Sequence, residues 1–183
     1  MSNGDVSQGR RRFLIGATSV VGGVGVVGAA VPFVASWNPS AKAEAAGAPV
    51  TVNVSKLEPG QQMTVKWRGK PVWVIRRTEE MNENILELND QVKDPLSKEA
   101  DQPAYIEGEL RALKDEYAVL VGICTHLGCS PQFRPEVAPA DLGENWLGGF
   151  YCACHGSRYD LAGRVYPNMP APSNLQVPPY RFD

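Results

Sequence analysis

The chain has 183 residues, enough for one globular domain with an appendage. Its formal net charge of −2 at pH 7 gives no electrostatic reason to expect nucleic-acid binding or a basic membrane-binding surface. Hydrophobic residues make up 43% of the chain but gather in one N-terminal stretch, so this stretch and the remaining chain have different roles.

Residues 1–12 are polar and end in three arginines, Arg10 to Arg12. Together with Phe13 and Leu14, these arginines resemble the core of a twin-arginine export signal, and that pathway exports folded proteins. An ordinary basic flank is the alternative. In either case the excess of positive charge before the apolar stretch predicts a cytoplasmic N-terminus and an exported remainder.

Residues 13–36 contain no charged side chain. As a helix they would span about 36 Å, which exceeds the roughly 30 Å of a bilayer's hydrocarbon core. We therefore expect one transmembrane helix here. The alternatives are a core helix and a cleaved signal peptide, for which Ala41 to Ala45 offers small-residue cleavage sites. Residues 37–49 are rich in alanine and predict a hinge linker, flexible or transiently helical.

Residues 50–183 predict a mainly β head domain. Alternating apolar residues indicate strands at 51–54 and 63–67, and further apolar runs indicate strands at 72–76 and 117–123. Thr78 is placed to cap a short helix that reaches about Leu88.

Every cysteine and histidine of the chain lies in one of two short windows, residues 124–129 and 152–157. The six residues are Cys124, His126, Cys129, Cys152, Cys154 and His155. Such clustering indicates a shared chemical task. Structural zinc usually uses wider spacings than Cys-x-His and would leave two cysteines over. An all-cysteine cluster would leave both histidines without a role, and so would a pair of structural disulfides.

The spacing C-x-H followed by C-x-x-H resembles the Rieske [2Fe–2S] motif, in which two histidines replace two cysteines on one iron. The resemblance implies an antiparallel β-sandwich head whose cluster-binding subdomain spans about residues 120–173. It also implies the roles of the six residues. Cys124 and Cys152 bind one iron, His126 and His155 bind the other, and Cys129 pairs with Cys154 in a disulfide.

The resemblance extends to residues around the ligands. The hydroxyls of Ser157 and Tyr159 match positions that donate hydrogen bonds to sulfur and so stabilise the reduced cluster. Leu127 matches an apolar residue that shields the cluster, with a core leucine as the alternative. Residues 169–172 match a proline loop covering the cluster, although Met169 stands where the family often has glycine.

Two departures from the family also appear. The segment 134–146 is expected to be a surface insertion. The sequence stops at Asp183, where relatives generally continue with one more short strand, so either the chain lacks this strand or the sequence is truncated.

The quinol-oxidising branch of this family implies the function. The chain would be the iron–sulfur subunit of a bacterial quinol–cytochrome c reductase, not catalytic alone. His155 would face quinol beside cytochrome b, and the head would deliver the electron to cytochrome c1 within a dimeric complex of the inner membrane, with the head in the periplasm. The alternatives are the Rieske subunit of an arsenite-oxidase-type enzyme and a ferredoxin-like Rieske carrier.

Overall fold

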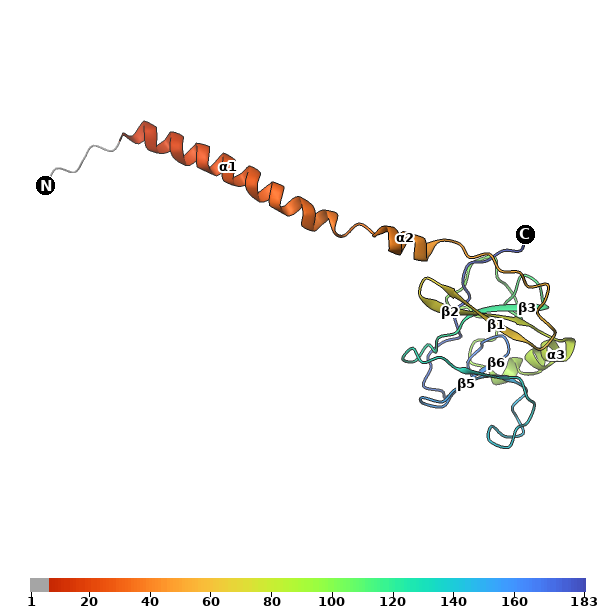
Figure 1. Ribbon diagram of the computed structural model, residues 1–183. Helices are drawn as coiled ribbons and strands as arrows, with labels where there is room; N and C mark the ends of the chain where they lie inside the picture. Colours follow the sequence, from red (N-terminus) through yellow and green to blue (C-terminus); the bar gives the residue numbers. More distant parts are fainter. Residues whose placement is uncertain (1–6) are drawn as a thin grey trace. The chain divides into compact units, whose positions relative to one another are not determined.

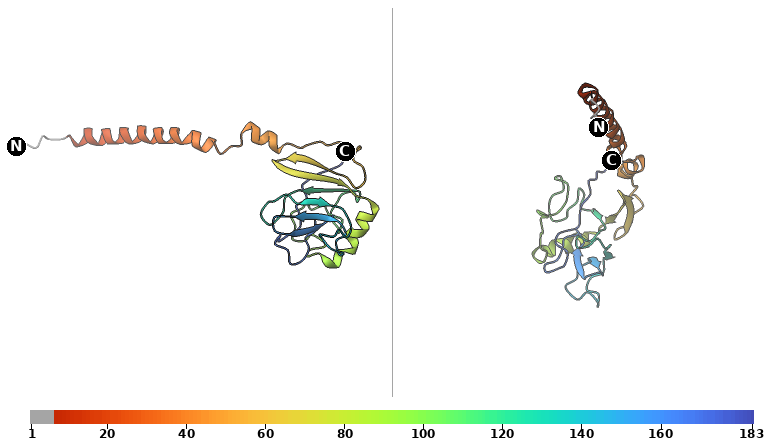
Figure 2. Two further views of the ribbon diagram at one scale, coloured as in Figure 1. Left: turned by 60° about the horizontal axis from the view of Figure 1, so that its bottom comes forward. Right: turned by 90° about the vertical axis from the view of Figure 1, so that its left-hand side faces the viewer.

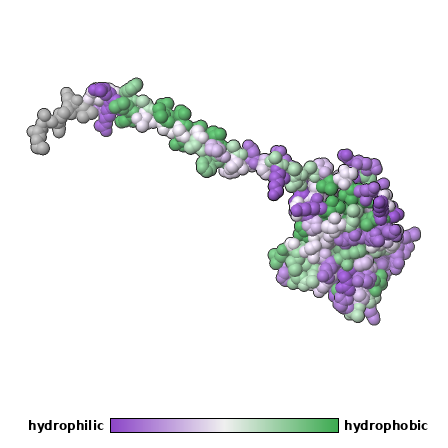
Figure 3. Space-filling model, viewed as in Figure 1, coloured by the Kyte–Doolittle hydropathy of each residue, from purple (hydrophilic) through white to green (hydrophobic). Residues whose placement is uncertain are grey.

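The computed structural model describes residues 7–183, which form two compact units that divide after Gly47. In the first unit, helix α1 (Gln8–Ala35) is followed by the short helix α2 (Ala41–Gly47). All side chains of α1 are exposed, and its apolar part is long enough to cross a membrane. Figure 3 shows hydrophobic residues along α1 and hydrophilic residues at its start. Residues 1–6 of the expected N-terminal segment lie outside the described part of the chain.

The head contains two antiparallel sheets of three strands each (Figure 1). The first sheet has the order β1 (Gln62–Trp67), β2 (Lys70–Arg76) and β3 (Tyr117–Val121). Arg68 and Gly69, both at positive φ, make the two-residue turn between β1 and β2. The second sheet has the order β4 (Gln132–Arg134), β5 (Gly149–Cys152) and β6 (Ser157–Asp160).

The two sheets pack face to face around one apolar core (Figure 1, Figure 2). Trp73 of β2 stacks on Phe150 of β5 with ring centroids 4.9 Å apart. Leu120 of β3 and Tyr159 of β6 belong to the same core, as do the thiols of the two windows. The functional windows are therefore built on the core and not on a detached surface loop.

Helix α3 (Glu79–Glu87) and the 3₁₀ turn η1 (Asn89–Gln91) follow the first hairpin. The Thr78 side chain accepts a hydrogen bond from the Met81 backbone N–H, as the sequence predicted. The strand expected at 51–54 is absent. The Asn53 side chain instead accepts a hydrogen bond from the Ser55 N–H, which bends the chain before it can pair with a neighbouring strand.

Candidate functional site

The two cysteine–histidine windows form turns of the same kind. In the first, the Gly128 N–H donates to the Cys124 carbonyl, and in the second the Gly156 N–H donates to the Cys152 carbonyl. Both glycines have positive φ, 84° and 78°, which L side chains rarely adopt. Each turn thus holds a buried cysteine at its base and exposes the residue just before the glycine, Leu127 in the first window and His155 in the second.

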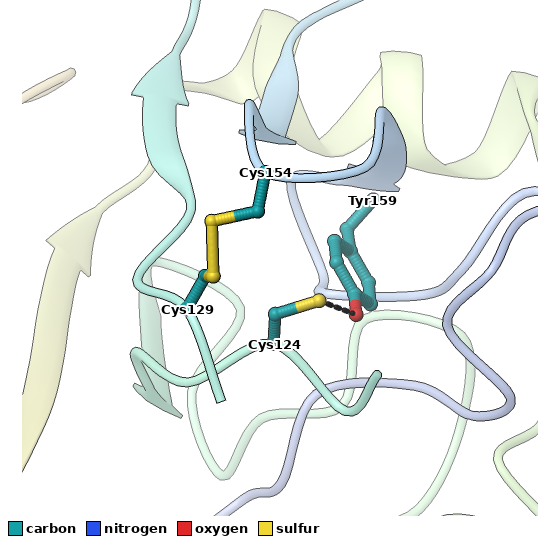
Figure 4. The surroundings of a disulfide bond; sticks show 4 residues. All are labelled: Cys124, Cys129, Cys154 and Tyr159. Carbon is teal, nitrogen blue, oxygen red and sulfur yellow. Dashed lines mark hydrogen bonds between the residues drawn. A yellow bond between two sulfur atoms is a disulfide. The ribbon is translucent and has the colours of Figure 1, made fainter. Parts of the chain in front are cut away.

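The structure joins the windows through a disulfide between Cys129 and Cys154 (Figure 4). This is the pairing that the family resemblance implied. Cys124 and Cys152 remain free, and both are buried. The sulfurs of Cys129, Cys152 and Cys154 lie within 4.8 Å of one another, but only Cys152 among these three has a thiol to offer a metal.

Burial, and then the neighbouring Cys124 thiol, raise the pKa of the Cys152 thiol. The rings of His126 and His155 also lie close, with centroids 4.7 Å apart and planes at 83°. The fold therefore brings two buried thiols and two neighbouring imidazoles together from windows more than twenty residues apart in the chain.

The environments of the two histidines differ. His126 is half-buried and His155 is exposed. Leu127 is 71% exposed, so it is not a core leucine. A group held by these windows would be enclosed on the thiol side and reachable from solvent on the side of His155.

Tyr159 contacts the first window directly (Figure 4). Its hydroxyl lies 3.2 Å from the Cys124 sulfur and accepts a hydrogen bond from the Thr125 backbone N–H. Burial raises the pKa of the Tyr159 phenol, so the hydroxyl keeps its proton at neutral pH. Because its oxygen accepts from the Thr125 N–H, its proton can be donated to an acceptor at Cys124 or to the Thr125 hydroxyl oxygen.

Ser157 is fully buried and is arranged in the same way. Its hydroxyl oxygen accepts a hydrogen bond of 3.1 Å from the backbone N–H of Ala171. Ala171 lies in the expected proline segment 169–172, which together with Ser173 is called the proline loop below. The Ser157 proton is then free to be donated toward the interior between the windows. Both hydroxyls that sequence reasoning selected are thus oriented by a backbone N–H from an opposing loop.

Thr125 is a site residue that sequence reasoning missed. Its hydroxyl donates to the Ser173 carbonyl at 2.7 Å and lies 3.1 Å from the Tyr159 hydroxyl. It therefore links the first window, the second sheet and the proline loop. Its position between Cys124 and His126 was the only available signal.

The expected insertion folds on itself. The Arg134 side chain binds Asp141 through two contacts of 2.8 and 2.9 Å, and the Trp146 ring N–H donates to the Arg134 carbonyl. Trp146 is buried and stacks on Tyr166. The segment is therefore a fixed extension of the second sheet.

The donor set fits a [2Fe–2S] cluster of mixed ligation. Two thiols suit one iron, and two imidazoles suit the other. The disulfide accounts for the remaining two cysteines, so no sulfur is left unassigned. A structural zinc site with four ligands would not need the buried Tyr159 hydroxyl beside the Cys124 sulfur.

Comparisons with known proteins agree with this geometry. Residues 48–179 match the family described as "Rieske [2Fe-2S] domain". Residues 1–40 match the family described as "Ubiquitinol-cytochrome C reductase Fe-S subunit TAT signal". The second match concerns the segment with the three arginines.

Individual relatives cover nearly the whole chain. The "Ubiquinol-cytochrome c reductase iron-sulfur subunit" of Allochromatium vinosum is 57% identical over 100% of this chain and 88% of its own length. The protein of the same name from Bradyrhizobium diazoefficiens is 40% identical over 94% of this chain and 89% of its own length.

A solved structure, "Hyperthermophilic respiratory Complex III", contains a chain with a TM-score of 0.50 and 28% identity. The match covers 94% of this chain and 95% of that one. The chain therefore belongs to the Rieske [2Fe–2S] family, as a member of the ubiquinol–cytochrome c reductase iron–sulfur subunits.

Proposed function

We propose that this chain is the electron-transfer subunit of a bacterial quinol–cytochrome c reductase, working beside cytochrome b and cytochrome c1. When bound, its cofactor would supply one-electron transfer at a potential between about −150 and +300 mV. Cys124 and Cys152 would hold one iron, and His126 and His155 the other. The observation that carries the proposal is the pairing of two buried thiols with an exposed imidazole at His155.

His155 is the residue proposed to meet the quinol. Its exposed imidazole is placed to accept a hydrogen bond from a quinol hydroxyl and then to take the proton. Leu127, exposed in the first window, would contribute apolar contact with the quinol pocket of cytochrome b and keep water away. The disulfide between Cys129 and Cys154 would fix the distance between the two windows during this contact.

The proposed placement follows from the first unit. Helix α1 would anchor the chain in the inner membrane, with the three arginines in the cytoplasm and the head in the periplasm. An oxidising periplasm suits the disulfide. Residues 37–49 would be the hinge on which the head moves between quinol and cytochrome c1, in a complex that is a dimer.

Low-temperature EPR on membranes from cells that express the chain tests the proposal. We expect a Rieske-type signal after reduction with ascorbate alone, because quinol oxidation needs a high-potential cluster. Replacing Cys124 or Cys152 by serine should abolish the signal. The matched control is Ala153→Ser, an exposed position inside the second window, which should retain it.

Two results would contradict the proposal. A signal that requires dithionite would indicate a low-potential, ferredoxin-like carrier. A wild-type chain with no signal under either reductant would instead favour a zinc centre at this site.

A further inference from the structure

The proline loop is hydrogen-bonded to a segment around Lys93, which is distant from both windows in the sequence. The Lys93 ammonium donates to the Pro172 carbonyl at 2.6 Å. The backbone of Lys93 also donates to the Val165 carbonyl at 2.9 Å. Residues 93–97 therefore lie against both the proline loop and the chain that returns from β6.

Asn174 is the buried centre of this arrangement and is 1% exposed. Its side-chain oxygen accepts from the Val165 N–H at 2.8 Å. Its amide nitrogen donates to the Asp94 carbonyl and to the Ser97 hydroxyl, each at 2.9 Å. One side chain thus satisfies three groups from two other segments and uses both of its N–H bonds.

The position of Asn174 connects this network to the site. Ser173, its neighbour, accepts the hydrogen bond from Thr125, and Ala171 donates the one that orients Ser157. Both contacts require the loop 169–173 to stay at its present distance from the windows. The neighbouring prolines at 170 and 172 have no N–H, so the loop has few backbone hydrogen bonds of its own.

We propose that Asn174 is a positioning residue for the cluster, acting through the Ala171–Ser157 contact. Loss of its amide would leave the buried Val165 N–H and the buried Ser97 hydroxyl without this partner and release the loop. The Ser157 hydroxyl would then lose the N–H that fixes its oxygen, and its donation toward the cluster would weaken. The proposal rests on the ligand set of the preceding section.

The test is a redox titration of the full-length chain, followed by the visible circular dichroism of the cluster. Asn174→Leu is expected to lower the midpoint potential in the same direction as Ser157→Ala. The double variant should shift the potential by less than the sum of the two single-variant shifts, because both substitutions act on the same Ser157 hydrogen bond. A role in stability alone would move the unfolding midpoint but not the potential.

Two further variants keep the test decisive. Gln176→Leu is the matched control, because it removes a side-chain bond from the same C-terminal segment to Asp101 without touching the proline loop, and it should leave the potential unchanged. If Asn174→Leu does not fold, Ser97→Ala removes one of the three bonds and should give a smaller shift of the same sign.

Two outcomes overturn the proposal: a folded Asn174→Leu or Ser97→Ala variant with the wild-type potential, or shifts that add fully to those of Ser157→Ala. Failure of the proposed ligand set would look different, because the wild-type chain itself would then lack the Rieske spectrum.

Discussion

The two windows use the same turn with different residues at corresponding positions. Four residues after its first cysteine, each window has a glycine at positive φ. Three residues after the cysteine, the first window exposes Leu127 and the second exposes His155. Five residues after it, Cys129 of the first window corresponds to Ser157 of the second. The same loop geometry thus exposes an apolar side chain in the first window and an imidazole in the second.

The largest expected effect on stability comes from the Cys129–Cys154 disulfide, which joins the two windows. Replacing Cys129 or Cys154 by serine should lower the free energy of unfolding by about 3 kcal/mol, the value for a disulfide that closes a loop of this size. Urea unfolding followed by the visible circular dichroism of the cluster would measure it. Equal losses in the single and double variants are required, since all three remove one bond.

The next largest effect is expected at the two buried hydroxyls, Ser157 in the second window and Tyr159 just after it. Ser157→Ala and Tyr159→Phe should each lower the midpoint potential by roughly 60 mV, the equivalent of one hydrogen bond of about 1.4 kcal/mol. The physical reason is that donors near the sulfurs stabilise the reduced, more negative cluster. A redox titration in which neither variant shifts would remove both residues from the site.

The equivalence of the turns can be tested at the glycines. Gly128→Ala and Gly156→Ala should each cost about 1 kcal/mol of stability, because both positions have positive φ. A Cβ at either position meets no atom within 4 Å, so the cost comes from the backbone alone. Clearly unequal losses in urea unfolding would show that the two turns differ in strain.

The smallest effect on stability is expected at Leu127. Since its side chain is 71% exposed, Leu127→Ala should change the free energy of unfolding by less than about 0.5 kcal/mol. Quinol-dependent turnover should nevertheless fall, because the side chain is proposed to contact the quinol pocket. Unchanged turnover in membranes would assign this tip no role beyond the loop itself.

Local signals in the sequence predicted much of the fold. The cap at Thr78, the strand at 72–76 and the apolar run before Cys124 each depend on neighbouring residues. The strand expected at 51–54 was wrong because alternation alone does not provide a pairing partner. There the side chain of Asn53 competes for the backbone.

The site was predictable where a motif carried it and not where distant segments meet. The spacing of the six cysteine and histidine residues indicated the cofactor class, and the structure pairs Cys129 with Cys154. The contacts of Thr125 with Ser173, and of Asn174 with Asp94, join residues 48 and 80 positions apart. No local pattern encodes such pairs, because their partners are set only by the packing of the head.

The bonds around residue 174 also set a timing for biogenesis. Residues 174–180 hydrogen-bond back to Asp94, Asp101, Tyr105 and Leu113. The interior of the head therefore cannot close until this stretch has left the ribosome. A head whose interior depends on this stretch suits an export route that accepts folded cargo, as the match of residues 1–40 to a family described as a TAT signal indicates.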